Sequence, residues 1–371
     1  MKFVFWTATA LIVYVYVGYP AWLWLRGCWR SRPVCRDAYR PFVSIILVVR
    51  NEVHVIANKL NNLLALDYPW DSYEIVPVSD GSEDGTAYIL DQYTADPRIR
   101  PIHTLRGGKA MGLNAALAKA RGDVIVFTDA RQKVALDAVR LLMENFSDPT
   151  VGCASGELIL GDSNSGESVK GVGLYWKVEK MVRQLESLSG SIVGATGALY
   201  AVRRSLVSNL PAETILDDVY IPMTVVSRGF RVIFDERAHA WDLPDRGSHD
   251  EFYRKVRTLS GNYQLVWFAP WLLSTNNPIR FEFVSHKLLR LLVPFALVAV
   301  FLSTLQLQTP IYRIALVFQL AFYSLALLSL LPFKLGRLAL AADAAFTFVL
   351  LNAAAAAAFY KFITGRRPAW S

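Results

Sequence analysis

Four long apolar stretches constrain the fold of this 371-residue chain more than any other feature. They contain no charged residue and cover Phe3–Leu25, Leu291–Tyr312, Ile314–Phe333 and Ala344–Tyr360. A helix of about 20 apolar residues is long enough to cross a bilayer. We therefore predict a transmembrane anchor at residues 1–28 and about three transmembrane helices within residues 285–362, on either side of a polar middle region.

The residues that flank the first stretch favour an uncleaved anchor with a fixed orientation. Tyr, Trp and Arg follow it, where a signal peptide would have a small-residue cleavage site. One lysine precedes it and five arginines follow it: Lys2, then Arg26, Arg30, Arg32, Arg36 and Arg40. The positive-inside rule places the arginine side in the cytoplasm. The middle region is therefore expected on the cytoplasmic face of the cell (inner) membrane.

The C-terminal end conflicts with a simple topology. Three crossings after a cytoplasmic domain would place the tail outside, yet the tail carries Lys361, Arg366 and Arg367. Two interpretations stay open: the tail is an exception to the rule, or one apolar stretch lies in the membrane interface.

Composition excludes several classes of function. The net charge is +8, but many of the cations flank apolar stretches, where anionic lipid is the usual partner. No nucleic-acid-binding motif is present, so we expect no nucleic-acid partner. Cys28, Cys35 and Cys153 lack the spacing of a metal site, which favours a reduced compartment. A transporter is disfavoured because the apolar stretches hold almost no ionisable residue.

The middle region, residues 41–245, alternates between strand and helix patterns. The predicted strands are Val43–Val49, Tyr73–Val78, Ile99–His103 and Val124–Thr128, and the predicted helices are Val53–Leu66, Lys109–Ala120 and Ser168–Leu188. Near-continuous apolar strands separated by helices are typical of a parallel sheet that is covered on both faces. A further helical pattern, Phe252–Phe268 within residues 250–275, is rich in Trp, Tyr and Arg. We predict that it is an amphipathic helix at the membrane surface.

Four acidic residues lie where such a sheet binds ligands, beyond the carboxyl ends of its strands or at a helix start. Asp80 can accept hydrogen bonds from a base or ribose, or it can cap a turn. Asp129 needs a partner, which a divalent cation or Arg131 would supply. Asp217 and Asp218 are adjacent, and like charges raise one pKa of such a pair, which suits a general base near neutral pH. Helix capping is the alternative for this pair.

Cationic and imidazole side chains accompany the carboxylates. Lys109 lies in a Gly-Gly-Lys-Ala segment at a helix start, where backbone N–H groups and a cation favour phosphate. The spacing is not that of the phosphate loop, which disfavours an ATPase. Arg257 can pair with a diphosphate or with lipid headgroups. His239 and His249 are candidate ligands, although a lone histidine is more often structural.

Several motifs resemble, in order and spacing, the membrane-bound branch of glycosyltransferase family 2 over roughly residues 41–265. They read PFVSIILVVRNE, SDGSEDGT, GGKAMGLNAAL, FTDAR, GATGALYAVRR, ILDDV and RKVRT. The resemblance implies an α/β fold of the glycosyltransferase-A type, a Rossmann-like mixed sheet with helices on both faces. It also implies an inverting transfer of a sugar from a nucleotide diphosphate, with UDP as the expected nucleotide.

The resemblance also assigns roles to individual residues. Those implied to bind the donor nucleotide and diphosphate are Asn51, Glu52, Asp80, Lys109, Arg131 and Arg257. The acceptor end falls to Thr196 and Gly197. Asp129 takes the metal position, and Asp217 and Asp218 take the catalytic position, with Asp218 as the base.

Two departures from the family pattern affect these expectations. Arg131 stands where the second carboxylate of the Asp-x-Asp metal site is expected, which puts the Mg²⁺ or Mn²⁺ cofactor in doubt. Arg254 and Thr258 replace the Gln and Trp that are associated with processive synthesis, so the resemblance does not imply a processive enzyme.

The hypotheses that remain differ in product and in class. One is a hexosyltransferase that makes a single transfer to a membrane lipid. Another is an enzyme that extends a polysaccharide of the cell envelope, either as a single chain or as a homo-oligomer. The acceptor is then a glycan or a lipid-linked molecule. From a different class, the domain would be a catalytically silent nucleotide-sugar binder that regulates a membrane partner, a hypothesis that Arg131 supports.

Overall fold

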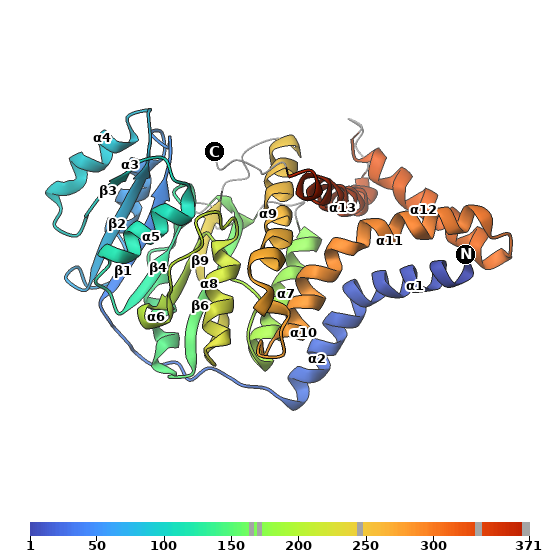
Figure 1. Cartoon of the computed structure of the whole chain (residues 1–371), viewed down its shortest axis with the longest axis horizontal. Helices are drawn as coiled ribbons and strands as arrows, with labels where there is room; N and C mark the ends of the chain where they lie inside the picture. Colours follow the sequence, from blue (N-terminus) through green and yellow to red (C-terminus); the bar gives the residue numbers. More distant parts are fainter. Residues whose placement is uncertain (163–166, 169–172, 243–247, 331–335, 366–371) are drawn as a thin grey trace.

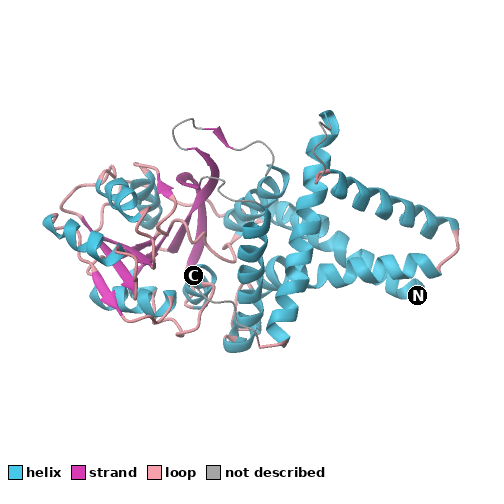
Figure 2. Ribbon diagram, turned by 90° about the horizontal axis from the view of Figure 1, so that it is seen from above, coloured by secondary structure: helices cyan, strands magenta, loops and turns pink. Residues whose placement is uncertain are grey.

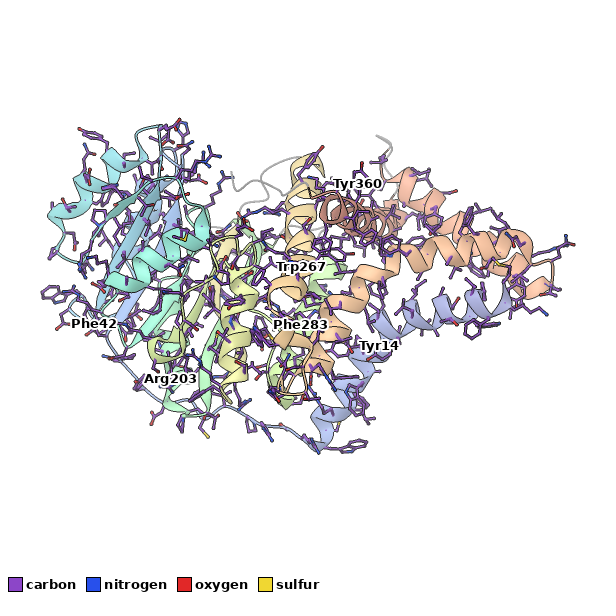
Figure 3. The ribbon with its side chains drawn as sticks, in the orientation of Figure 1. Tyr14, Phe42, Arg203, Trp267, Phe283 and Tyr360 are labelled. Carbon is purple, nitrogen blue, oxygen red and sulfur yellow. The ribbon has the colours of Figure 1, made fainter. Side chains whose placement is uncertain are left out.

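The computed structural model of the chain describes residues 1–162, 167–168, 173–242, 248–330 and 336–365. The strands gather at one end of the molecule and the long apolar helices at the other, with helix α9 (Ser248–Phe268) between them (Figure 1, Figure 2). Phe42 and Arg203 lie at the sheet end, whereas Tyr14 and Tyr360 lie at the helical end (Figure 3).

The polar middle region forms a nine-stranded sheet in the order β3-β2-β1-β4-β8-β6-β9-β5, with β7 paired to β6 off this path. The strands are β1 Val43–Val49, β2 Tyr73–Asp80, β3 Ile102–Thr104, β4 Val124–Phe127, β5 Lys133–Val134, β6 Val151–Asp162, β7 Glu167–Ser168, β8 Tyr200–Arg203 and β9 Arg231–Asp242. Strand β1 pairs in parallel with β2 and with β4, and β2 pairs in parallel with β3. The predicted parallel sheet is therefore confirmed for this half.

The other half makes the sheet mixed, as the family resemblance implies. Strand β8 runs antiparallel to both β4 and β6, whereas β6 and β9 are parallel. Because β8 is reversed, its first residue, Tyr200, pairs with Phe127 at the carboxyl end of β4. The turn that precedes β8, which contains Thr196 and Gly197, is thereby brought to the edge where the parallel strands end.

Helices cover both faces of the sheet because alternate strand residues point to opposite sides. All seven residues of β1 are buried. Ile45 and Leu47 belong to one apolar core with residues of α3 (Ile56–Leu64), α4 (Thr86–Gln92) and α6 (Ala138–Glu144). Ile46 and Val48 belong to the opposite core with residues of α5 (Lys109–Lys119) and α8 (Asp217–Ser227).

Some element bounds differ from the prediction. The helix predicted from Val53 begins only at Ile56, because side chains of a neighbouring loop bind the N–H groups of residues 51–53. The third strand begins at Ile102, since Ile99 makes only an isolated bridge to Ile75. The helix predicted from Ser168 is α7 (Gly173–Ser189), and Ser168 belongs to β7. Residues 169–172 lie outside the described residues.

Four helices of the described chain are long and apolar enough to cross a membrane, one N-terminal and three C-terminal, as expected. They are Lys2–Trp29, Arg280–Gln306, Pro310–Leu328 and Ala339–Ile363. The first is built from α1 (Lys2–Val13), a π-helical turn and α2 (Tyr19–Trp29), and the second from α10 (Arg280–Phe283), a π-helical turn η6 (Val284–Leu288) and α11 (Leu289–Gln306). The third and fourth are α12 and α13. Residues 331–335 lie outside the described residues, and the sidedness of the helices stays a prediction.

Helix α9 lies between the sheet domain and the apolar helices. Its Tyr263 ring stacks on Phe362 of α13, with ring centroids 5.4 Å apart. On the domain side, Gln264 donates a hydrogen bond to the backbone oxygen of Glu213 and accepts one from the N–H of Ile215. The predicted surface helix is therefore partly covered by protein, and it ends at Phe268, before a separate 3₁₀ turn at Pro270–Leu273.

A buried group of polar side chains ties the sheet domain to the membrane helices. We call Tyr19, Glu179, Glu186, His286 and Arg290 the Glu186 cluster. Glu186, which is fully buried on α7, accepts a hydrogen bond from the Tyr19 hydroxyl at 2.6 Å and lies 2.8 Å from Nδ1 of His286. Glu179 accepts a hydrogen bond from Arg290 at 2.7 Å and lies 3.1 Å from Nε2 of His286. Segments from α2, α7 and the start of the second membrane helix are thus joined at one point.

Candidate active site

Three acidic residues and one lysine meet at the carboxyl edge of the parallel strands. Lys109, the first residue of α5, places its Nζ 3.0 Å from Oδ1 of Asp129 and 3.1 Å from Oδ1 of Asp217. Burial opposes the charged form of Lys109, but the carboxylates of Asp129, Asp217 and Asp218 outweigh it and raise the pKa of Lys109 above its usual range. The lysine is therefore a permanent cation that bridges the end of β4 and the start of α8.

Asp218 has the properties of a general base. Burial, and next the charge of Asp217, raise its pKa from 3.8 to about 6, although the ammonium groups of Lys109 and Lys287 act in the opposite direction. The Asp218 side chain still keeps part of its surface exposed. A carboxylate with this pKa is mostly ionised near neutral pH and can take up a proton.

The turn before β8 completes the group. A Cβ atom placed on Gly197 would lie 3.5 Å from Oδ2 of Asp129 and 3.6 Å from Oδ2 of Asp218. Both carboxylates thus point toward one place, which stays open because residue 197 has no side chain. Backbone contacts hold this turn: the N–H of Ala195 donates to the Asp218 carbonyl at 2.7 Å, and the N–H of Thr196 donates to the Ser155 hydroxyl at 3.0 Å.

Asp80 lies at the same edge, but its carboxylate already has partners within the protein. It is fully buried and accepts hydrogen bonds from the N–H groups of Gly107 at 2.7 Å and Gly108 at 3.0 Å. These glycines directly precede Lys109, and Gly108 has a positive φ of 88° that favours glycine. In this structure Asp80 therefore shapes the loop that presents Lys109.

Asn51 and Glu52 lie in a turn beside the acidic residues. Asn51 has a positive φ of 52°, and its side chain accepts a hydrogen bond from the N–H of Glu83. Glu52 forms an ion pair with Arg131, with Nε and Oε1 2.8 Å apart. The suggestion that Arg131 is the partner of Asp129 is therefore corrected: within the described chain Arg131 pairs with Glu52, and Lys109 pairs with Asp129.

The sequence of the sheet domain matches a known family. Residues 44–210 match the family described as Glycosyl transferase family 2. The chain carries a family 2 glycosyltransferase domain. Its relatives include a beta-monoglucosyldiacylglycerol synthase from Synechocystis sp., which is 29% identical over 186 residues, covering 48% of this chain and 39% of that protein. A poly-beta-1,6-N-acetyl-D-glucosamine synthase from Staphylococcus aureus is 24% identical over 229 residues, covering 60% of this chain and 55% of that protein. The match thus spans only 39% and 55% of the lengths of these two relatives.

The fold of the glycosyltransferase domain and its helices is also found in a solved structure. A mannosyltransferase from Pyrobaculum calidifontis in complex with GDP-Man and Mn²⁺ superposes with a TM-score of 0.75 at 24% sequence identity. The superposition covers 98% of this chain and 99% of that chain. The likeness extends over the sheet domain and the four long apolar helices, and it establishes the glycosyltransferase-A-type fold.

Three of the predicted site residues are not joined to the acidic residues of the glycosyltransferase domain. Arg257 lies on α9, and its side chain makes no hydrogen bond or ion pair with another described residue. His239, on β9, faces Glu157, with Nε2 3.7 Å from Oε2. The side chain of His249 lies outside the described residues.

Sequence reasoning missed one residue of this edge, Lys59. It is 3% exposed on α3 and donates hydrogen bonds to the Thr128 hydroxyl at 2.8 Å and to the Gln132 carbonyl at 2.7 Å. Burial lowers the pKa of Lys59 to about 7, while the charge of Asp129 acts against this shift. The signal was present in the sequence, because Lys59 lies at helical spacing among the apolar residues Ile56, Leu60 and Leu63.

The residues of the glycosyltransferase domain fit a divalent cation that arrives with a diphosphate. Among the described residues, no three His, Cys, Asp or Glu side chains are grouped as a metal site. Mg²⁺, however, usually binds one or two carboxylates together with substrate phosphates. The Oδ2 atoms of Asp129 and Asp218 both face the open place at Gly197, while Oδ1 of Asp129 is bound by Lys109. With Asp129 as the one carboxylate ligand, this arrangement suits an ion shared with the diphosphate rather than a preformed metal cage.

Proposed function

We propose that this chain transfers a sugar from a nucleoside diphosphate, with UDP as the nucleotide, to a glycan or lipid-linked acceptor at the cytoplasmic face of the membrane. The convergence of the Asp129 and Asp218 carboxylates on the open place at Gly197, beside the cation Lys109, carries the proposal. Two relatives support the two kinds of acceptor. The name of one is that of a glycolipid synthase, which favours a lipid-linked acceptor, and the name of the other is that of a polysaccharide synthase, which favours a glycan acceptor.

In the proposed reaction, the acceptor hydroxyl attacks the anomeric carbon of the donor sugar. A bond forms between the acceptor oxygen and this carbon, the bond from the carbon to the diphosphate oxygen breaks, and the hydroxyl proton passes to Asp218. The raised pKa of Asp218, about 6, suits this role, because a general base works best when its pKa lies near the working pH. Attack opposite to the leaving group inverts the configuration.

The leaving diphosphate gains negative charge in this step, and Lys109 is placed to stabilise it. The lysine stays charged because three carboxylates surround it. A preorganised cation at the place where charge develops is usually one of the largest contributions to catalysis. Asp129 would hold Mg²⁺ or Mn²⁺, which would add positive charge beside the diphosphate. Asp80 contributes by fixing the glycine loop before Lys109, in addition to its expected contact with the nucleoside.

The first test is Asp218→Asn in the full chain, purified in detergent. We expect sugar transfer to fall by about 10²–10⁴-fold, since the general base is lost. Binding of the donor, measured by calorimetry, should stay close to that of the wild type. Near-normal turnover by this variant would remove Asp218 from the catalytic role.

The nucleotide and the product are tested with labelled donors. Wild-type protein in vesicles is given UDP-sugars and GDP-sugars in turn, because the Pyrobaculum calidifontis structure contains GDP-Man. Transfer from UDP-sugars is expected, and transfer from GDP-sugars alone would overturn the choice of UDP. A single labelled product indicates one transfer to a lipid, whereas a ladder of products indicates a polymer.

A further inference from the structure

Lys59 is an ionisable side chain in a place where the fold would accept an apolar one. It lies on the face of α3 that packs into the sheet domain, beside Ile56 and Leu60 of the same core. Removing an ammonium group from water costs several kcal/mol unless good hydrogen bonds replace its hydration. The position therefore needs an explanation in terms of what the ammonium group contacts.

The ammonium group joins the two ends of one short loop. Thr128 and Gln132, which accept its hydrogen bonds, stand at either end of residues 128–132, and this loop carries Asp129. The Thr128 hydroxyl in turn donates to the carbonyl of Ala198 at 2.8 Å. Ala198 directly follows Gly197. A chain of hydrogen bonds thus runs from Lys59 through the Asp129 loop to the turn that Asp129 faces.

A second lysine, from another helix, acts on the same loop. Lys109, on α5, pairs with Oδ1 of Asp129 at 3.0 Å, while Lys59, on α3, binds the two ends of the loop that carries Asp129.

We propose that Lys59 is a positioning residue for donor binding, which holds the Asp129 carboxylate against the Gly197 turn, where the diphosphate and its divalent cation bind. This inference rests on the proposed function. It differs from a purely structural role because it predicts a loss of affinity for cation and nucleotide, and not only a loss of stability.

The first experiment replaces the ammonium group while keeping the length of the side chain, in Lys59→Met. The full-length protein is titrated with Mn²⁺ in the presence of UDP and of GDP, and bound Mn²⁺ is followed by electron paramagnetic resonance. Loss of a partner that orients a metal ligand typically weakens metal binding by about 10–100-fold, and we expect a change of this size. Lys119→Met, on the exposed end of α5, is the matched control and should bind Mn²⁺ like the wild type.

A second pair of variants tests the same chain of hydrogen bonds without touching the lysine. Thr128→Val removes the hydroxyl that links Lys59 to Ala198, whereas Thr128→Ser keeps it. We expect weaker Mn²⁺ binding for the valine variant and recovery for the serine variant. In the double variant Lys59→Met with Thr128→Val the losses should be less than additive, because both changes break one network.

The outcomes separate the inference from the proposed function. If the wild type binds Mn²⁺ and nucleotide but Lys59→Met and Thr128→Val bind them equally well, with a change only in melting temperature, the positioning role is refuted and the proposed function stands. If Lys59→Met fails to fold, the Thr128 pair alone decides. If the wild type binds neither UDP nor GDP and transfers no sugar, the proposed function itself fails.

Discussion

At the scale of the residue, the partners of each charged side chain decide what it can do. That Asp80 and Asp129 lie at one edge could be predicted, because the carboxyl ends of parallel strands share an edge. Their partners could not. Arg131 pairs with Glu52 rather than Asp129, and Asp80 binds the N–H groups of Gly107 and Gly108. Both pairings depend on how separate loops meet in the folded chain, and a local sequence pattern does not contain that information.

The coupling between Asp217 and Asp218 gives a pH prediction. The pKa of Asp218 is raised to about 6, so the active, ionised form is lost as the pH falls through this value, and activity should fall with it. The negative charge of Asp217 is the second cause of this raised pKa. Asp217→Asn should therefore move the acidic limb of the kcat/KM profile to lower pH. A limb that does not move, in a variant whose fold and donor binding are intact, would contradict the coupling.

The raised pKa of Asp218 also determines how the stability of the fold changes with pH. Because the folded pKa of Asp218 lies above its ordinary value of 3.8, the fold favours the protonated form. The stability that Asp218 contributes is present at low pH and is lost as the pH rises through about 6. We expect Asp218→Asn, which cannot ionise, to lose less stability than the wild type as the pH rises from about 4 to about 6, the interval between the two pKa values, and thermal melts over this interval measure the difference.

At the scale of the element, the half of the sheet that repeats a strand–helix pattern was predictable and the other half was not. Strands β1, β2 and β4 are built on near-continuous apolar runs, and such runs indicate buried parallel strands. Strand β8 has only four residues, Tyr200–Arg203, and its reversed direction is set by its pairing with β4 and β6. The direction of so short a strand comes from its neighbours and not from its own residues.

The packing of α9 against the segment before α8 gives a prediction at this scale. A Cβ atom on Gly261 would lie 2.5 Å from Cγ of Leu216, which directly precedes Asp217. Gly261→Ala should therefore push Leu216 and the start of α8 away, at a cost of about 1–3 kcal/mol in stability. We expect kcat to fall while donor affinity changes less. Thr258→Ala, on the exposed side of the same helix, should leave kcat unchanged, and equal activity of both variants would show that this contact does not align the acidic pair.

At the scale of the whole molecule, the Glu186 cluster joins the glycosyltransferase domain to its membrane helices. Glu186→Gln removes the negative charge that His286 faces and leaves one carbonyl oxygen in place of two carboxylate oxygens. Hydrogen bonds to a buried charged group are typically worth about 1.5–3 kcal/mol, so the melting temperature of the full chain should fall clearly. Glu236→Gln, on the half-exposed Glu236 that pairs with Lys180, should cost less than about 1 kcal/mol. Equal melting temperatures of the two variants would show that the Glu186 cluster does not stabilise the contact between the domain and the helices.

This cluster has a consequence for which acceptors are reachable. Since α2, α7 and the start of the second membrane helix are fastened to each other at Glu186, the domain cannot swing freely over the bilayer. In the proposed orientation, Asp218 is then kept at one height above the bilayer. Under the proposed function, a lipid-linked acceptor must bring its hydroxyl to that height, so we expect the length of its polar part to limit which molecules receive the sugar.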